Sequence, residues 1–153
     1  MLDTTNSNIV IRNATKNDIP AILEMVKELA IYEKEPNAVT ATLENYYDDF
    51  ENHIFESCVA TLNDQIIGIT IYYMTYSTWK GRTLFLEDFI VKQAYRKCGV
   101  GQLLFDRFIE EAKQKKCVMA KWQVLEWNTI AINFYKKNNV VFETDWVNVK
   151  SFF

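Results

Sequence analysis

The chain has 153 residues, the size of one compact domain, and 49% of them are hydrophobic, enough for a core and too many for a wholly disordered protein. Its net charge is −3 and no basic stripe stands out, which disfavours a nucleic-acid-binding protein. No apolar run approaches the roughly 20 residues that a membrane-spanning helix needs, so we expect no membrane partner.

The chain has three cysteines and one histidine, His53, without the spacing of a disulfide framework or a metal site. Residues 1–8 lack the apolar stretch of a secretion signal. We therefore expect a cytoplasmic protein without a metal. Residues 1–8 are predicted to form a flexible tail, and residues 9–153 a single domain.

The first half of the chain predicts a strand, two helices and a pair of strands. Residues 9–12 form the first strand, and an apolar stripe from Ile19 to Ala30 at helical spacing gives the first helix. A second, weaker helix covers 42–50. The turn Asn63-Asp64 joins strands at 55–62 and 65–73 as a hairpin, and 76–81 form a loop.

The second half alternates strands and helices. A long apolar strand is predicted at 82–91. The helix opened by Gly99 and Gly101 carries the apolar stripe Leu103, Leu104, Phe108, Ile109 and Ala112. A strand at 117–125, a helix at 127–138, and one or two final strands within 140–153 are predicted to follow. This order predicts a mixed α/β domain, with an antiparallel meander in its first half and a βαβ unit in its second. Its sheet is expected to have six to seven strands, flanked by about four helices.

The segment Tyr95-Arg96-Lys97-Cys98-Gly99-Val100-Gly101 links the long strand to its helix. Glycine lets the backbone approach a bulky anion, and free N–H groups at a helix start attract phosphates. The spacing is neither that of a dinucleotide fold nor that of a P-loop. Alone, it fits a phosphate-binding bend or an ordinary structural turn.

Two adjacent acids, Glu87 and Asp88, lie inside the long apolar strand. Strand alternation is expected to point their side chains to opposite faces. A buried, unpaired carboxylate is costly, so each must reach a cation, a polar network or an open cavity. Two interpretations follow: a buried ion pair with an exposed edge residue, or a cleft where one acid meets a cationic substrate and acts as base.

The last predicted helix places Asn128, Ala131, Ile132 and Tyr135 on one face. Tyr135 is either core packing or a general acid.

Together, these features resemble the GNAT superfamily of N-acetyltransferases. The likeness narrows to the diamine and thialysine N-acetyltransferase branch through four segments: 27–34, 76–82, Leu86-Glu87-Asp88, and 127–136. The resemblance implies an acyl-CoA N-acyltransferase fold and acetyl-CoA as co-substrate. It also implies acetyl transfer to the primary amine of a small cationic substrate by direct attack, in a homodimer.

The resemblance also implies roles for individual residues. Tyr135 is the expected general acid and Glu87 the expected base, possibly through water. The remaining expected site residues are Phe89, Ile90, Val91, Arg96, Lys97, Cys98, Gly99, Val100, Gly101, Asn128, Tyr135 and Lys136 for the cofactor, and Tyr32, Glu33, Trp79, Glu87, Asp88 and Trp146 for the amine.

Three departures from relatives stand out. Lys97 and Asn139 occupy positions where relatives often have glycine, and asparagine tolerates the left-handed conformation. Ser77 replaces an aspartate that polyamine-preferring members tend to carry, which favours a thialysine-like amino acid or a short diamine. The alternatives are a GNAT acting on a protein lysine or N-terminus, and a non-catalytic acyl-CoA-binding module.

Overall fold

A computed structural model describes residues 8–153. The predicted flexible tail therefore lies outside the described residues, apart from Asn8, which is exposed. The chain divides into two compact units, Met1–Trp122 and Gln123–Phe153. In the described part, none of the helices combines the length and the hydropathy that crossing a membrane requires.

The first unit follows the predicted order of elements, with small shifts at their ends. Its elements are β1 (Val10–Asn13), the 3-10 turn η1 (Lys16–Asp18), α1 (Ile19–Tyr32), α2 (Leu43–Glu51), β2 (Glu56–Leu62), β3 (Gln65–Ser77), β4 (Gly81–Val91), η2 (Gln93–Tyr95), α3 (Val100–Gln114) and β5 (Met119–Trp122). The largest shift is in β3, which runs past its predicted end into the segment expected to be a loop.

The strands form one five-stranded sheet in the order β1-β2-β3-β4-β5. Neighbours are antiparallel except β4 and β5, which are parallel. A parallel pair needs a crossover connection, and α3 supplies it. The predicted meander followed by a βαβ unit is therefore confirmed.

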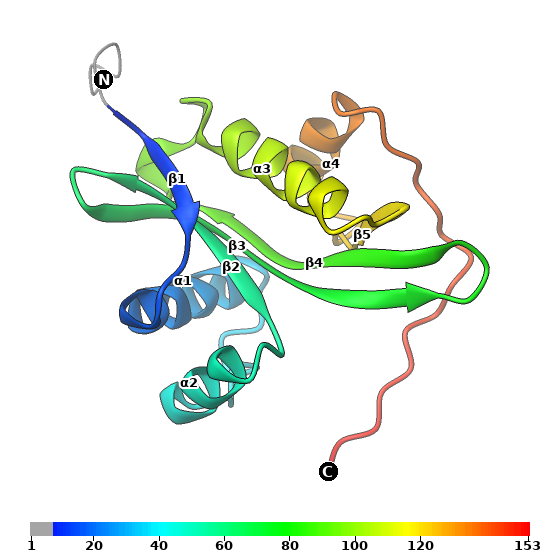
Figure 1. Cartoon of the computed structure of the whole chain (residues 1–153), viewed down its shortest axis with the longest axis horizontal. Coiled ribbons are helices and arrows are strands. Elements are labelled where there is room, and N and C mark those ends of the chain that lie inside the picture. Colours follow the sequence, from blue (N-terminus) through cyan, green and yellow to red (C-terminus); the bar gives the residue numbers. More distant parts are fainter. Residues whose placement is uncertain (1–7) are drawn as a thin grey trace. The chain divides into compact units, whose positions relative to one another are not determined.

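Helices cover both faces of this sheet, α1 and α2 on one and α3 on the other (Figure 1). The core beneath α3 consists of Cys58, Ala60, Ile67, Tyr72, Leu84, Leu86, Val100, Leu104, Phe108 and Ala112. The core beneath α1 is smaller and consists of Ile19, Ile22, Met25, Val59, Ile69, Ile71 and Ile90. The apolar stripes predicted for the two long helices thus face the sheet, except for Leu103, which is 44% exposed.

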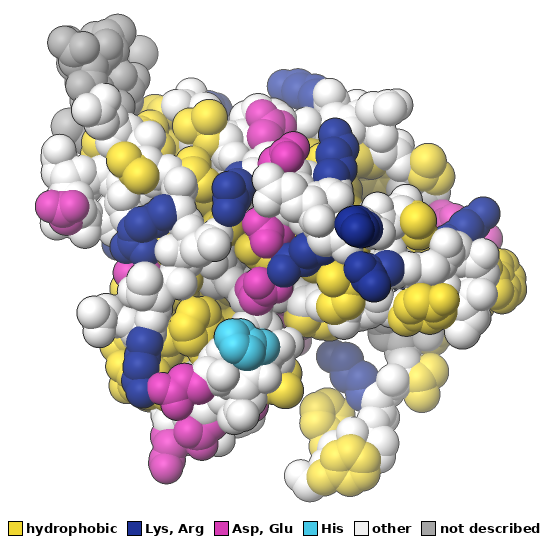
Figure 2. Space-filling model, viewed as in Figure 1, with side chains coloured by type: hydrophobic (Ala, Val, Ile, Leu, Met, Phe, Trp, Pro, Cys, Tyr) yellow, Lys and Arg dark blue, Asp and Glu magenta, His cyan; other side chains and the backbone are white. Residues whose placement is uncertain are grey.

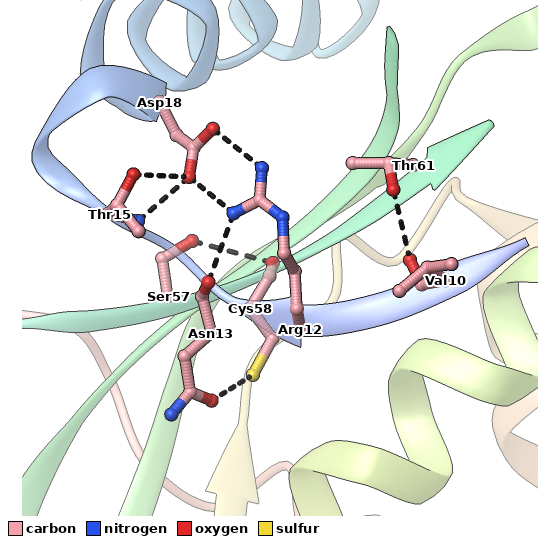
Figure 3. Close-up of polar contacts among 8 residues, drawn as sticks. All are labelled: Val10, Arg12, Asn13, Thr15, Asp18, Ser57, Cys58 and Thr61. Atoms are coloured by element: carbon pink, nitrogen blue, oxygen red, sulfur yellow. Dashed lines mark hydrogen bonds and ion pairs between the residues drawn. The ribbon is translucent and has the colours of Figure 1, made fainter. Parts of the chain in front are cut away.

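A polar cluster fixes the entry of the chain into α1 (Figure 3). The guanidinium of Arg12 donates two hydrogen bonds to the carboxylate of Asp18, at 2.7 and 2.9 Å. The backbone N–H of Thr15 also donates to this carboxylate. Arg12, followed by the hydrogen bond to Thr15, lowers the pKa of Asp18, although burial acts in the opposite direction. The cluster ties β1 to the helix that covers one face of the sheet.

The second unit contains one helix, α4 (Thr129–Lys136), shorter than the predicted helix at 127–138. Asn139 has a φ of +52°, so the left-handed turn expected to be feasible there is present. The prediction of final strands was wrong: residues 140–153 form no strand. Strand-forming side chains need a ladder partner, and Val141, Val149 and Phe152 stay exposed.

Candidate active site

A β-bulge in β4 brings the two acids of the long strand together. Ile71 of β3 pairs with Asp88, but the next residue, Tyr72, pairs with Leu86, so Glu87 is the extra residue. A bulge shifts the alternation of side chains by one position. Asp88 therefore joins Glu87 on the α1 and α2 side. The expectation of opposite faces was wrong, because alternation holds only where pairing is regular.

Two neighbouring cavities meet at these acids. The larger, about 370 Å³, is named the α1 cavity, and the smaller, about 290 Å³, the α2 cavity. Both are lined by Ala41, Tyr46, Glu87 and Asp88. The α1 cavity is completed by Val26, Leu29, Ala30, Glu33, Ala38, Val39 and Thr40, and the α2 cavity by Asp49, Ile54, Phe55, Ile71 and Tyr73.

The cavities are acidic. In the described part of the chain, no lysine, arginine or histidine lines either of them, whereas four carboxylates do. None of the ion pairs within residues 8–153 includes Glu87 or Asp88. The cleft interpretation of the two acids therefore fits the structure, and the ion-pair interpretation does not. Such a site attracts a cation.

The acids differ in their surroundings. Burial, followed by the charges of Glu87 and Glu33, raises the pKa of Asp88 to about 7. Glu87 is exposed, and its Oε2 accepts a hydrogen bond of 2.7 Å from the hydroxyl of Tyr73. Burial, followed by the charges of Asp88 and Glu87, raises the pKa of Tyr46 to about 12, so its phenol keeps its proton. Asp88 can thus hold or accept a proton near neutral pH.

The predicted phosphate-binding bend has the required backbone shape. Gly99 has a φ of +84° and directly precedes α3, whose first N–H groups have no partner within the helix. A Cβ added at Gly99 would meet nothing within 4 Å, so the space above it is open. Lys97 is also left-handed, with a φ of +63°. These features suit an anion at this helix start.

Arg96 has partners in the first unit. Its Nε donates to the carbonyl of Val91 at 3.1 Å, and its guanidinium lies 5.2 Å from the ring centre of Tyr32. A residue predicted to bind the cofactor thus contacts one predicted to line the amine site. Tyr32 itself lines neither cavity.

The other predicted cofactor residues lie at the end of β4 and around the start of α3. Phe89, Ile90 and Val91 pair with β3, while the ladder between β4 and β5 ends at Leu86. Cys98 is exposed and Val100 is buried at the start of α3.

Several predicted residues do not join the cavities. Trp79 is 86% exposed at the turn between β3 and β4. Ser77 accepts a hydrogen bond of 3.1 Å from the backbone N–H of Lys80, so it caps this turn. Neither residue lines a cavity, so the substrate preference inferred from Ser77 has no support in the cavity geometry.

Four predicted site residues lie in the second unit. The side chain of Asn128 caps α4 by accepting a hydrogen bond of 3.2 Å from Ala131. Tyr135 and Lys136 belong to the same helix, and the ring of Tyr135 contacts that of Phe134. Trp146 is 78% exposed. Their roles stay predictions.

Among the titratable residues that line the cavities, sequence reasoning missed three: Tyr46, Asp49 and Tyr73. Tyr46 and Asp49 lie on the helix predicted most weakly, and Tyr73 lies on the strand beside β4. Their closeness to Glu87 depends on the bulge and on the packing of α2. No local pattern carries that information.

Comparison with known proteins identifies the family of the chain. The sequence model of the Acetyltransferase (GNAT) family matches residues 20–139. The chain is 36% identical over 140 residues to a thialysine N-epsilon-acetyltransferase of Sus scrofa, covering 85% of this chain and 82% of that protein. A Caenorhabditis elegans protein of the same name is 32% identical over 128 residues, covering 84% of this chain and 80% of that protein.

A human relative is longer. The chain is 35% identical over 144 residues to spermidine/spermine N(1)-acetyltransferase-like protein 1 of Homo sapiens, covering 88% of this chain but only 21% of that protein.

Solved structures agree on the fold. An aminoglycoside acetyltransferase from an uncultured soil metagenomic sample has a TM-score of 0.80 at 17% identity, covering 95% of this chain and 96% of that one. An aminoglycoside N-acetyltransferase in complex with CoA has a TM-score of 0.78 at 17% identity, covering 98% and 99%. With its family match, its relatives and this mixed α/β fold, the chain belongs to the GNAT family of acetyltransferases.

Proposed function

We propose that the chain transfers an acetyl group from acetyl-CoA to the primary amine of a small cationic substrate by direct attack. The substrate is a thialysine-like amino acid, a diamine or a polyamine. The observation that carries this proposal is the pair Glu87 and Asp88, which faces two cavities without a lysine, arginine or histidine in their described lining. The names of the relatives, which specify thialysine and spermidine or spermine, support the same chemistry.

The bend before α3 fits the diphosphate of coenzyme A, because Gly99 leaves open space beside a helix start and two cations flank it. Residues 96–101 would hold this group, and Phe89, Ile90 and Val91 would hold the pantetheine arm. Asn128 and Lys136 of the second unit are also proposed to bind the cofactor. When bound, acetyl-CoA supplies an acetyl group activated as a thioester.

The acidic pair has two tasks. It attracts the ammonium form of the substrate, which predominates because an alkylamine has a pKa near ~10.4. It must also take a proton from that ammonium, since only the neutral amine attacks. Glu87 is the expected base, and Asp88 lies beside it in the lining of both cavities.

Tyr135 keeps its predicted role as general acid, with its phenol giving a proton to the leaving sulfur. A homodimer and a cytoplasmic location also remain predictions.

The test measures acetyl-CoA turnover as thiol release. The acceptors are thialysine, lysine, putrescine, spermidine and a short lysine peptide. We expect release that depends on a small cationic amine. Faster turnover of the peptide would favour a protein acetyltransferase. Binding of acetyl-CoA without thiol release, whichever amine is added, would favour a non-catalytic acyl-CoA-binding module.

A further inference from the structure

The two cavities differ in their walls. The α2 cavity is lined by three aromatic rings, Tyr46, Phe55 and Tyr73, together with Ile54 and Ile71. Tyr46 and Phe55 pack edge to face, with ring centres 5.7 Å apart. Aromatic faces attract ammonium groups, and aliphatic side chains pack against methylene groups. These walls suit an alkyl chain that ends in a cation.

Carboxylates reach this cavity from two elements, β4 and α2. Glu87 and Asp88 occupy the part that it shares with the α1 cavity, and Asp49 of α2 supplies a further carboxylate. Asp49 is exposed, so solvent reaches its charge. Helix α2 carries four acidic residues and no basic one, and acidic side chains gather over it (Figure 2).

The α1 cavity is less suited to a second cation. Its own carboxylate is Glu33, which is half-buried, and burial raises its pKa. Apart from Tyr46, which both cavities share, the described walls of the α1 cavity contain no aromatic ring.

We propose that the α2 cavity is the subsite for the non-reacting end of the amine substrate, with a second ammonium beside Asp49 and the reacting amine at Glu87 and Asp88. This inference rests on the proposed function and narrows its substrate class to aliphatic diamines. The α-carboxylate of an amino acid placed in the same way would meet Asp49, and like charges repel.

The test compares 1,4-diaminobutane with n-butylamine, which has the same carbon chain and one amine. Asp49→Asn is expected to lower kcat/KM for the diamine by about fivefold, as for loss of one exposed charge pair, and to leave n-butylamine unchanged. Asp48→Asn is the matched control, because Asp48 precedes Asp49 on α2 but lines neither cavity. It should change neither rate.

A charge reversal sharpens the test. Asp49→Lys is expected to lower kcat/KM for the diamine further and to raise it for lysine, whose α-carboxylate would then meet a cation. Thermal unfolding of each variant checks that α2 still packs.

Three results would overturn the inference. Asp49→Asn could behave like Asp48→Asn, which would remove the subsite while leaving the proposed function intact. Glu33→Gln, and not Asp49→Asn, could abolish the higher kcat/KM for the diamine relative to n-butylamine. That result would place the distal ammonium in the α1 cavity. If the unaltered protein acetylated no amine, the proposed function and this inference would fail together.

Discussion

The acids beside α3 and the acid pair on β4 differ in whether a basic side chain pairs with them. Under α3, acids have basic partners: Lys115 pairs with Glu56 at 2.9 Å and with Glu111 at 3.5 Å, and Arg107 pairs with Glu111 at 3.3 Å. On the other face, Glu87 and Asp88 have no such partner among residues 8–153. Unneutralised charge gathered beside a cavity is the reason why we propose that this face binds a ligand.

Packing follows the same division. Under α3, Phe108 is fully buried and contacts the rings of Tyr72, Phe105 and Trp122. Under α1 and α2, space remains for two cavities. The closed face is expected to contribute more to stability, and the open face holds the proposed site. Substitutions on the two faces should therefore be separable by whether they change stability or turnover.

The largest expected effect lies on the closed face. Phe108→Ala removes a fully buried ring and leaves a void, so we expect a loss of about 3–5 kcal/mol in the free energy of unfolding. Phe55→Ala is the comparison on the open face, where the ring already borders a cavity and is only half-buried. Urea denaturation should show a clearly smaller loss for Phe55→Ala. Equal losses would contradict the contrast in packing.

The next effect concerns Asp88 and pH. Its pKa, raised from 3.8 to about 7, means that the folded protein keeps this proton in a range where the unfolded chain has lost it. Its contribution to stability therefore falls as pH rises between these values, and the ionised form is destabilising above about 7. Asp88→Asn removes the ionisation, so we expect a stability gain on the order of 2 kcal/mol at pH 8.

The gain should shrink toward pH 4, where Asp88 is neutral in the folded protein. Urea denaturation at several pH values checks this expectation, with Asp48→Asn as an exposed control that should show no such trend. A variant no more stable than the parent at pH 8 would show that the carboxylate is not desolvated.

The smallest effect concerns Tyr73. Tyr73→Phe removes the hydroxyl that donates to Glu87 and keeps the ring, which stacks on Phe85. Losing one hydrogen bond to a charged group should raise KM for the amine by about threefold or more, with little change in kcat. Tyr76→Phe, an exposed tyrosine farther along β3, is the control. An unchanged KM in Tyr73→Phe would remove Tyr73 from the site.

The sequence predicted the fold well because the decisive patterns were local. The stripes that include Ile22 on α1 and Leu104 on α3 recur at helical spacing, and both side chains are fully buried. The Asn63-Asp64 turn also joins its hairpin, with both residues at positive φ. The final strands failed because Val and Phe form a strand only where a neighbour offers hydrogen bonds.

The site was predicted in part. Glu33, Glu87 and Asp88 were expected around the amine, and all three line the α1 cavity. The bulge was not foreseen, because an extra residue in β4 appears only when its register against β3 is known. Asp49 and Tyr73 were missed for the same reason: tertiary packing brings them near the acids.

The most direct test of the central claim is amine-dependent thiol release from acetyl-CoA by the protein carrying both Glu87→Gln and Asp88→Asn. These changes keep the shape of the side chains and remove the charge and the proton acceptor. We predict a loss of about 10²-fold or more in kcat/KM, with the protein still folded. Turnover equal to that of the unaltered protein would contradict the assignment of this acidic face as the site where the amine binds and loses its proton.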